Sequence, residues 1–287
     1  MMLRHCRLES CLTVVAGLLL ASSAHALPPG VSQFAWQQGD SPVSMTSSSN
    51  TICGVVAVAG QYRGSGETVD ISNVNGTWQL SGTSQQQGVI AWARCVNWTK
   101  FLTNGGMTWT DPWTWNFQSD SARGHEQSVL ALSEGLNSFC WMGGFGGNWG
   151  NVPFDNLLYV DISLQTQGFT GGVLTDQSSF PFQYIHGRAL CSTMLGAATV
   201  KQPAFQSWSP TDNQAGSRKS LMSINSGICF LTKVGGMFSA STDSITIGVD
   251  GNNNQYLIGQ ARDWSPTAPN NWKSPTGKAI CIAYDQR

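Results

Sequence analysis

Charged side chains are scarce in this sequence. They make up 11% of the residues, and 15 Lys and Arg nearly balance 16 Asp and Glu, which gives a formal net charge of -1. A chain with so little excess of positive charge lacks the basic surface that binds the phosphates of nucleic acids. The composition therefore predicts no nucleic-acid partner.

Long hydrophobic runs are absent beyond the N-terminal segment, and no later stretch approaches the ~20 apolar residues that a transmembrane helix needs. The N-terminus has Arg4 and Arg7 ahead of an apolar run from Leu12 to Leu20, followed by the small-residue pattern Ala24–Ala26. This order is typical of a cleaved signal peptide, which we expect over residues 1–26. We therefore expect export without membrane insertion. The protein would be secreted or extracellular, or periplasmic in a bacterium.

Residue patterns that carry catalysis or bind metals are also missing. Only His125 and His186 follow the predicted signal peptide, and "HEQSV" at His125 lacks the second histidine of a zinc-protease helix. No C-x-x-C or G-x-S-x-G motif occurs. The run "DGNNNQ" at Asp250 lacks the sixth-position glycine and the closing glutamate of a calcium loop, so a hairpin turn is favoured. We predict no catalytic residue, no metal site and no cofactor.

What the sequence does have is an even set of cysteines. Six follow the predicted signal peptide, namely Cys53, Cys95, Cys140, Cys191, Cys229 and Cys281. An even number in an exported chain predicts disulfides, although six cysteines allow 15 pairings.

An internal repeat selects one of these pairings. The cysteines at 53, 140 and 229 are 87 and 89 residues apart, and those at 95, 191 and 281 are 96 and 90 apart. This period predicts three repeats of about 88 residues, over residues 27–108, 109–200 and 201–287. One disulfide inside each repeat gives Cys53–Cys95, Cys140–Cys191 and Cys229–Cys281. Pairing between repeats stays open as the alternative.

The glycine-rich stretch "CWMGGFGGNWG", residues 140–150, belongs to this repeat. Each repeat has a glycine seven residues after its first cysteine and an aromatic residue nine after it; these are Gly60, Gly147 and Gly236, and Tyr62, Trp149 and Phe238. A phosphate-binding loop needs a helix after it, whereas "FDNLLYVDISLQ" alternates like a strand. We therefore expect a strand with a close-packed glycine or a bulge.

Period-two hydrophobic patterns between the paired cysteines predict strands, with Asn75-Gly76 and Asp250-Gly251 as hairpin turns. Residues 121–138 fit a helix or a strand equally well. We predict an all-β protein in which each repeat is a small antiparallel sheet or sandwich with one internal disulfide. The three repeats are expected to pack together with pseudo-threefold symmetry, because the segments between them do not resemble flexible linkers.

The sequence is rich in tryptophan, with 12 residues. An indole ring can stack on the C–H face of a sugar while amide, carboxylate and hydroxyl groups bind its oxygens. Trp78 and Trp149 fit packing positions in the repeat. The predicted ligand-binding residues lie in segments that read as irregular and polar: Trp113, Trp115, Asp120, Trp208, Asp212, Trp264 and Trp272. Their alternative role is to fill the joints between repeats.

These features favour a secreted binding protein over an enzyme. Our leading hypothesis is a lectin or adhesin that binds an extracellular glycan or another cell-surface component, with the repeats adding multivalency. One alternative is a structural protein of a fibre, coat or matrix, which would use the repeats for self-association. The other is a hydrolase of polysaccharides, because the acidic residues are scattered and the sequence does not decide whether two of them converge.

Overall fold

The computed structural model describes the protein over most of its strand-forming sequence. It describes residues 27–49, 51–63, 66–86, 88–101, 108–109, 113–118, 125–131, 138–147, 158–165, 168–175, 185–195, 204–208, 217–236, 238–260 and 275–284. The predicted signal peptide lies outside them. The described residues are all-β, and the one helical turn among them is the 3-10 helix η1 (Trp98–Phe101). No helix in this part of the chain is long and apolar enough to cross a membrane.

Antiparallel pairing joins the strands into three sheets, which we number 1 to 3. Sheet 1 has the order β1 (Val31–Gln37), β6 (Ile90–Asn97), β3 (Thr51–Ala59), β17 (Ser244–Val249), β18 (Asn254–Gln260) and β15 (Arg218–Ser223). Sheet 2 has the order β2 (Val43–Ser47), β5 (Thr77–Thr83), β4 (Thr68–Val74), β10 (Ser138–Gly147), β13 (Ile185–Leu195) and β7 (Thr108–Trp109), with β8 (Trp113–Gln118) also paired to β13. Sheet 3 has the order β14 (Ala204–Trp208), β19 (Thr276–Ala283), β16 (Gly227–Gly235), β11 (Leu158–Gln165), β12 (Gly168–Thr175) and β9 (His125–Ala131).

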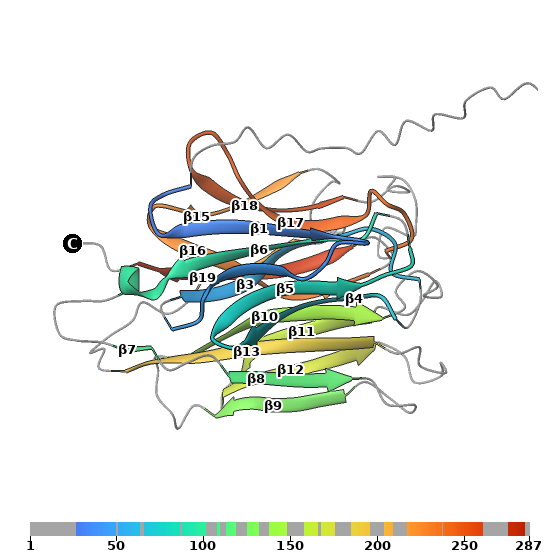
Figure 1. Cartoon of the computed structure of the whole chain (residues 1–287), viewed down its shortest axis with the longest axis horizontal. Helices are drawn as coiled ribbons and strands as arrows, with labels where there is room; N and C mark the ends of the chain where they lie inside the picture. Colours follow the sequence, from blue (N-terminus) through green and yellow to red (C-terminus); the bar gives the residue numbers. More distant parts are fainter. Residues whose placement is uncertain are drawn as a thin grey trace, which may run out of the picture.

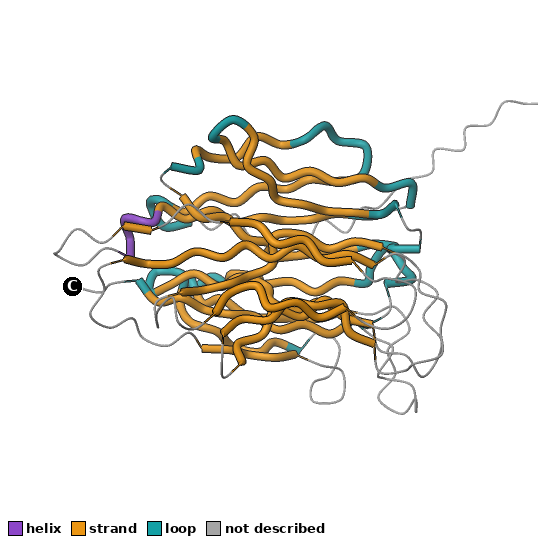
Figure 2. The backbone as a smooth tube through the Cα atoms, turned by 90° about the horizontal axis from the view of Figure 1, so that it is seen from below, coloured by secondary structure: helices purple, strands orange, loops and turns teal. Residues whose placement is uncertain are grey.

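The strands lie roughly parallel or antiparallel to the long axis of the molecule (Figure 1), and the described loops lie mainly at its ends (Figure 2). Within residues 121–138, which fit a helix or a strand equally well by sequence, residues 125–131 form the strand β9. Strand β8 likewise replaces the irregular segment expected around Trp113 and Trp115. β8 pairs with β13, and this pairing supplies backbone hydrogen bonds that cannot be recognised from the polar sequence of the segment.

Each sheet contains strands from two of the predicted repeats. β3 pairs with β17 in sheet 1, β4 with β10 in sheet 2, and β16 with β11 in sheet 3. A predicted repeat is therefore not a sheet closed on itself, because its strands divide between two shared sheets. Cross-repeat backbone hydrogen bonds make the assembly continuous rather than a string of separate units.

The three disulfides are those that the repeat predicted. They are Cys53–Cys95, Cys140–Cys191 and Cys229–Cys281, and they span 42, 51 and 52 residues. Each joins directly opposite positions of two neighbouring strands and is buried. Closing loops of this length stabilises the fold by about 4 kcal/mol each in the chain-entropy model. Three such bonds indicate folding in an oxidising environment.

The predicted role of the repeated glycines is confirmed. Gly60, Gly147 and Gly236 have φ of 108°, 111° and 88°, a region that side chains with a Cβ rarely adopt. In addition, β3, β10 and β16 each shift register three residues after their cysteine, between Val55 and Ala57, Met142 and Gly144, and Leu231 and Lys233. The glycine-rich segment at residues 140–147 is thus a bulged strand and not an anion-binding loop.

The two predicted hairpin turns are present, and one differs in detail. Asn75 and Gly76 have φ of 51° and 79°, as a tight β-hairpin requires. In the turn at Asp250, the positive φ of 62° belongs to Asn253 instead of Asp250 or Gly251. The Asp250 carboxylate accepts hydrogen bonds from the backbone N–H groups of Asn252 and Asn254, both at 2.9 Å, and so shapes a longer turn.

At the centre of the molecule, the residues that follow the first cysteine of each predicted repeat meet. Trp141 stacks on Phe230 with ring centroids 5.4 Å apart, and its indole N–H donates to the carbonyl of Cys53 at 2.7 Å. A Cβ atom at Gly54 would overlap both rings. Tyr62 and Phe238, the aromatic residues nine positions after Cys53 and Cys229, are buried and have ring centroids 5.7 Å apart. Trp149 lies outside the described residues.

Candidate functional site

The predicted ligand-binding residues are only partly placed. Trp113 and Trp115 lie in β8, with their Cα atoms opposite Cys191 and Ala189. Trp208 is the last residue of β14, opposite Gly277. The other predicted residues, Asp120, Asp212, Trp264 and Trp272, lie outside the described residues. The described part therefore does not bring the predicted set together into one site.

Trp36 and Asp40 have the same spacing in the first predicted repeat as the predicted ligand-binding residues Trp208 and Asp212 have in the third. Like Trp208, Trp36 lies on the first strand of its repeat and precedes an aspartate by four residues. Trp36 is 1% exposed, and its indole N–H donates to the backbone carbonyl of Asp40 at 3.1 Å. The Asp40 carboxylate accepts the backbone N–H of Gln37 at 3.1 Å. In this repeat the pair closes the end of a strand, which is a structural role.

The tryptophans with described side chains fall into two classes. Trp36, Trp78 and Trp141 are at most 1% exposed, and each indole N–H donates to a backbone carbonyl, at 3.1, 3.0 and 2.7 Å. Trp78 is thus confirmed as a packing residue. Trp92 is the fourth; it is half-buried, packs against the core on one side, and makes no hydrogen bond with the described residues.

Trp92 lies in a row of directly opposite residues that crosses all six strands of sheet 1. We call it the tryptophan row, and from β1 to β15 it consists of Ala35, Trp92, Ala57, Thr246, Ile258 and Arg218. Directly opposite residues in a sheet share one face. Ala91 and Ala93, on either side of Trp92 along β6, are fully buried on the other face. The tryptophan row therefore lies on the face opposite Ala91 and Ala93, which we call the outer face of sheet 1. On it Ala35 and Arg218 are exposed, Trp92, Thr246 and Ile258 are half-buried, and Ala57 is 1% exposed.

Arg218, at the edge of this row, is held by an aromatic neighbour. Its guanidinium carbon lies 4.2 Å from the ring centroid of Tyr256, which is two residues from Ile258 along β18 and so on the same face. Tyr256 lies opposite Gly248, and a Cβ atom at Gly248 would overlap the tyrosine ring. The glycine therefore lets the ring lie close to the sheet. The exposed Arg218 forms no direct ion pair with a described residue. Its charge nevertheless acts on the Asp250 carboxylate, whose pKa is lowered mainly by a hydrogen bond from the backbone of Asn254 and also by Arg218.

A second cation lies on the same face of β6, two residues from Trp92. Arg94 is 1% exposed and donates only to neutral acceptors: Gln33 Oε1 at 2.9 and 3.3 Å, Gln255 Oε1 at 3.1 Å and the Ile247 carbonyl at 3.3 Å. Burial lowers the pKa of its guanidinium to about 10. Arg94 is therefore still a cation at neutral pH, and no carboxylate bonds to it.

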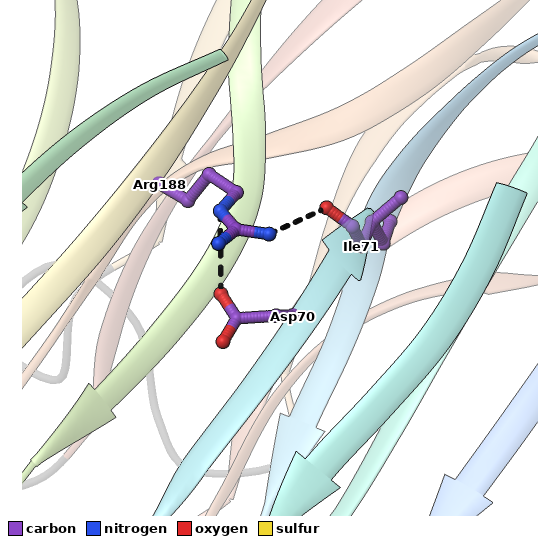
Figure 3. A network of polar contacts seen from close by, with 3 residues as sticks. All are labelled: Asp70, Ile71 and Arg188. Atoms are coloured by element: carbon purple, nitrogen blue, oxygen red, sulfur yellow. Dashed lines mark hydrogen bonds and ion pairs between the residues drawn. The ribbon is translucent and has the colours of Figure 1, made fainter. Parts of the chain in front are cut away.

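The corresponding row of sheet 2 has a different chemistry. We call it the ion-pair row, and from β8 to β5 it consists of Asn116, Arg188, Gly144, Asp70 and Ser81. Arg188 Nε lies 3.6 Å from Asp70 Oδ1, and Arg188 Nη1 donates to the Ile71 carbonyl at 3.1 Å (Figure 3). A Cβ atom at Gly144 would overlap the Asp70 carboxylate, so the glycine lets the pair form above the strand between them.

The corresponding row of sheet 3 is polar as well. We call it the lysine row, and from β14 to β9 it consists of Ser207, Lys278, Lys233, Asp161, Gly172 and Glu126. Each of the three rows passes through the fourth residue after the first cysteine of a repeat: Ala57, Gly144 or Lys233. At the position of Trp92 the other rows have Arg188 and Lys278. Sheet 1 alone has an aromatic side chain there.

Two of the described carboxylates have structural contacts. Asp70 is engaged with Arg188, and the Asp243 carboxylate accepts the backbone N–H groups of Ser239 and Ala240 at 2.7 and 2.8 Å. These contacts give both carboxylates structural roles. Within the described ranges, no group of three His, Cys, Asp or Glu side chains could hold a metal ion.

Trp92 was not among the residues predicted from the sequence, although its surroundings carry a signal. In "IAWARC", Trp92 and Arg94 alternate with Ala91, Ala93 and Cys95, so the large side chains share the face opposite the disulfide. The face opposite the disulfide is also the one that the indole occupies in the structure. Comparison with known protein families and with curated proteins finds no match to this chain. The function is therefore argued from its own residues.

Proposed function

We propose that the protein is an exported, non-catalytic lectin or adhesin that binds glycans on the outer face of sheet 1. The observation that carries this proposal is Trp92, a half-buried tryptophan whose indole N–H donates to no described residue, while three buried tryptophans each donate to a backbone carbonyl. An indole held by the core on one side and open on the other can stack on a sugar ring and donate one hydrogen bond. Exposed aromatic surface of this kind is typical of binding sites.

We further propose that the chain consists of three copies of one unit packed with pseudo-threefold symmetry. The strand orders support this arrangement. In each predicted repeat the first, third and sixth strands of the unit enter one sheet, and the second, fourth and fifth enter the next. The recurrent bulges and the positive φ of the aligned glycines support it independently. Of the three corresponding rows in the three sheets, the tryptophan row would then be the one that binds the ligand.

Export rests on two features. The first 26 residues have the order of a signal peptide, and the three disulfides are of the kind that persist in oxidising compartments. An extracellular location would also bring the protein into contact with glycans. Expression in the native host, followed by detection of the chain outside the cytoplasm, tests this part of the proposal.

The decisive experiment is binding of the non-reduced protein to a broad panel of immobilised glycans, with Trp92→Ala as the test variant. We expect saturable binding that free sugar competes away, and a loss of at least about tenfold in affinity on Trp92→Ala, equivalent to about 1.4 kcal/mol. Lys278→Ala is the matched control, because it changes the same register position in sheet 3. Circular dichroism confirms that both variants are folded.

A folded protein that binds no member of the panel would defeat the proposal. Light scattering on the same samples then tests the structural alternative, because a fibre or coat protein assembles with rising concentration in the absence of ligand. Release of reducing sugars from polysaccharides would instead support the hydrolase alternative.

A further inference from the structure

We propose that the ligand of the tryptophan row is an acidic polysaccharide, bound across the strands so that one sugar stacks on Trp92 and a carboxylate or sulfate group pairs with Arg218. This inference rests on the proposed glycan-binding function and adds the class of ligand. Three features of the row support this ligand: its span, the sign of its charges and the uncharged side chains between its ends.

The span of the row requires an extended ligand. Trp92 lies in β6 and Arg218 in β15, with β3, β17 and β18 between them. Four steps between neighbouring strands separate the two residues by ~19 Å along the sheet. A single sugar ring is too short to contact both, so a chain of several sugars is needed. Between the ends, Ala57 is 1% exposed and Thr246 and Ile258 are half-buried, so no charged or long side chain of the row separates Trp92 from Arg218.

The charge of the row favours an anion. Arg218 is exposed and without an ion pair among the described residues, and Arg94 adds a buried positive charge two residues from Trp92. None of the six positions of the row is acidic, whereas the ion-pair row contains Asp70 and the lysine row contains Asp161 at the position of Thr246. A guanidinium group matches carboxylate and sulfate oxygens in a bidentate geometry.

The structure also holds the Arg218 side chain where a ligand can use it. Its contact with the ring of Tyr256 restricts the guanidinium group on the outer face of β18. Because less side-chain freedom is lost on binding, such a preorganised arginine binds an anion more tightly than a freely mobile one.

Pairs of polysaccharides that share a backbone and differ in charge test the inference. Suitable pairs are polygalacturonate with its methyl ester, carboxymethyl cellulose with hydroxyethyl cellulose, and heparin with desulfated heparin. We expect the acidic member of at least one pair to bind about tenfold or more tightly than its neutral partner. This preference should fall as salt is raised, because the Debye length shrinks from about 30 Å at 0.01 M to about 3 Å at 1 M.

Variants locate the preference. Arg218→Gln should abolish the discrimination between acidic and neutral members, and Arg218→Lys should restore part of it, because lysine keeps the charge without the bidentate geometry. Arg188→Gln, in the ion-pair row of sheet 2, is the matched control and should change nothing in binding. Arg94 directly precedes Cys95, and the corresponding residues before Cys191 and Cys281 are Leu190 and Ile280. We therefore expect Arg94→Leu to leave the protein folded and to weaken its preference for acidic polysaccharides.

The outcomes separate the two proposals. Equal binding of acidic and neutral members, unaffected by salt or by Arg218→Gln, would overturn the acidic-ligand inference and leave the glycan-binding function standing. Absence of binding to every member and to the wider glycan panel would overturn the function itself.

Discussion

The outer faces of sheets 1 and 2 show how one backbone arrangement carries two kinds of surface. At corresponding positions sheet 1 has Trp92, Ala57 and Thr246, and sheet 2 has Arg188, Gly144 and Asp70. In sheet 2 the two charges neutralise one another above the glycine. In sheet 1 no described residue forms an ion pair with Arg94 or Arg218, and the Trp92 N–H donates to no described residue. The comparison teaches that unused binding capacity, and not the shape of the sheet, distinguishes the proposed site.

The largest expected effect comes from breaking the central packing that both sheets share. Gly54→Ala places a methyl group on the rings of Phe230 and Trp141, which have no free space beside them. Overpacking of this kind should lower the free energy of unfolding by about 3 kcal/mol. Denaturant unfolding of the oxidised protein measures it.

Gly66→Ala is the control for this change, because nothing lies within 4 Å of a Cβ atom at that glycine and its φ is not positive. Its unfolding free energy should stay within about 0.5 kcal/mol of the wild type. An equally stable Gly54→Ala variant would contradict the central contact of the three strands.

An exchange of rows tests the comparison itself. The triple variant Trp92→Arg, Ala57→Gly and Thr246→Asp gives sheet 1 the ion-pair row of sheet 2. The backbone accommodates that set in sheet 2, so we expect a folded protein whose glycan affinity is reduced at least about tenfold. Glycan-array binding and thermal melting measure the two properties.

Unchanged binding of the folded triple variant would place the ligand site elsewhere. The tryptophans predicted from the sequence would then be the next to test, beginning with Trp113 and Trp208. Each can be changed to phenylalanine, which keeps an aromatic ring and removes the indole N–H.

The smallest expected effect is loss of the ion pair of sheet 2. Asp70→Asn removes the charge opposite Arg188, while Arg188 keeps its hydrogen bond to the Ile71 carbonyl. Both side chains are 22% exposed, so solvent and salt weaken the pair. The unfolding free energy should fall by about 0.5 kcal/mol at low salt and by less at high salt. Glycan binding should not change, and a loss of binding would show that sheet 2 belongs to the site.

Local chemistry made part of the fold predictable. Period-two patterns identified strands, the dipeptide Asn75-Gly76 identified a hairpin, and the spacing of the cysteines identified all three disulfides. Each of these depends on residues close in sequence or on a periodicity that is visible in one dimension. The longer turn at Asp250 was predicted in place but not in conformation, because its carboxylate binds backbone groups beyond the expected dipeptide.

The candidate site was less predictable. From the sequence, tryptophans in polar segments were predicted to bind a ligand, and tryptophans in alternating strands were predicted to pack in the core. Trp78 fits that rule, whereas Trp92 does not, because the two indoles lie on faces with different surroundings. Which face of a strand becomes the core depends on what packs against it, and alternation alone gives only the period.

Side-chain periodicity and cysteine spacing were enough to predict the all-β class and the disulfide pairing, because both patterns are visible along the chain. The pairing of β3 with β17, β4 with β10 and β16 with β11 became known only from the folded chain, because hydrogen bonding between distant strands leaves no local pattern. That pairing aligns Trp92 with Arg218 across five strands, and so creates the surface on which the proposed function depends.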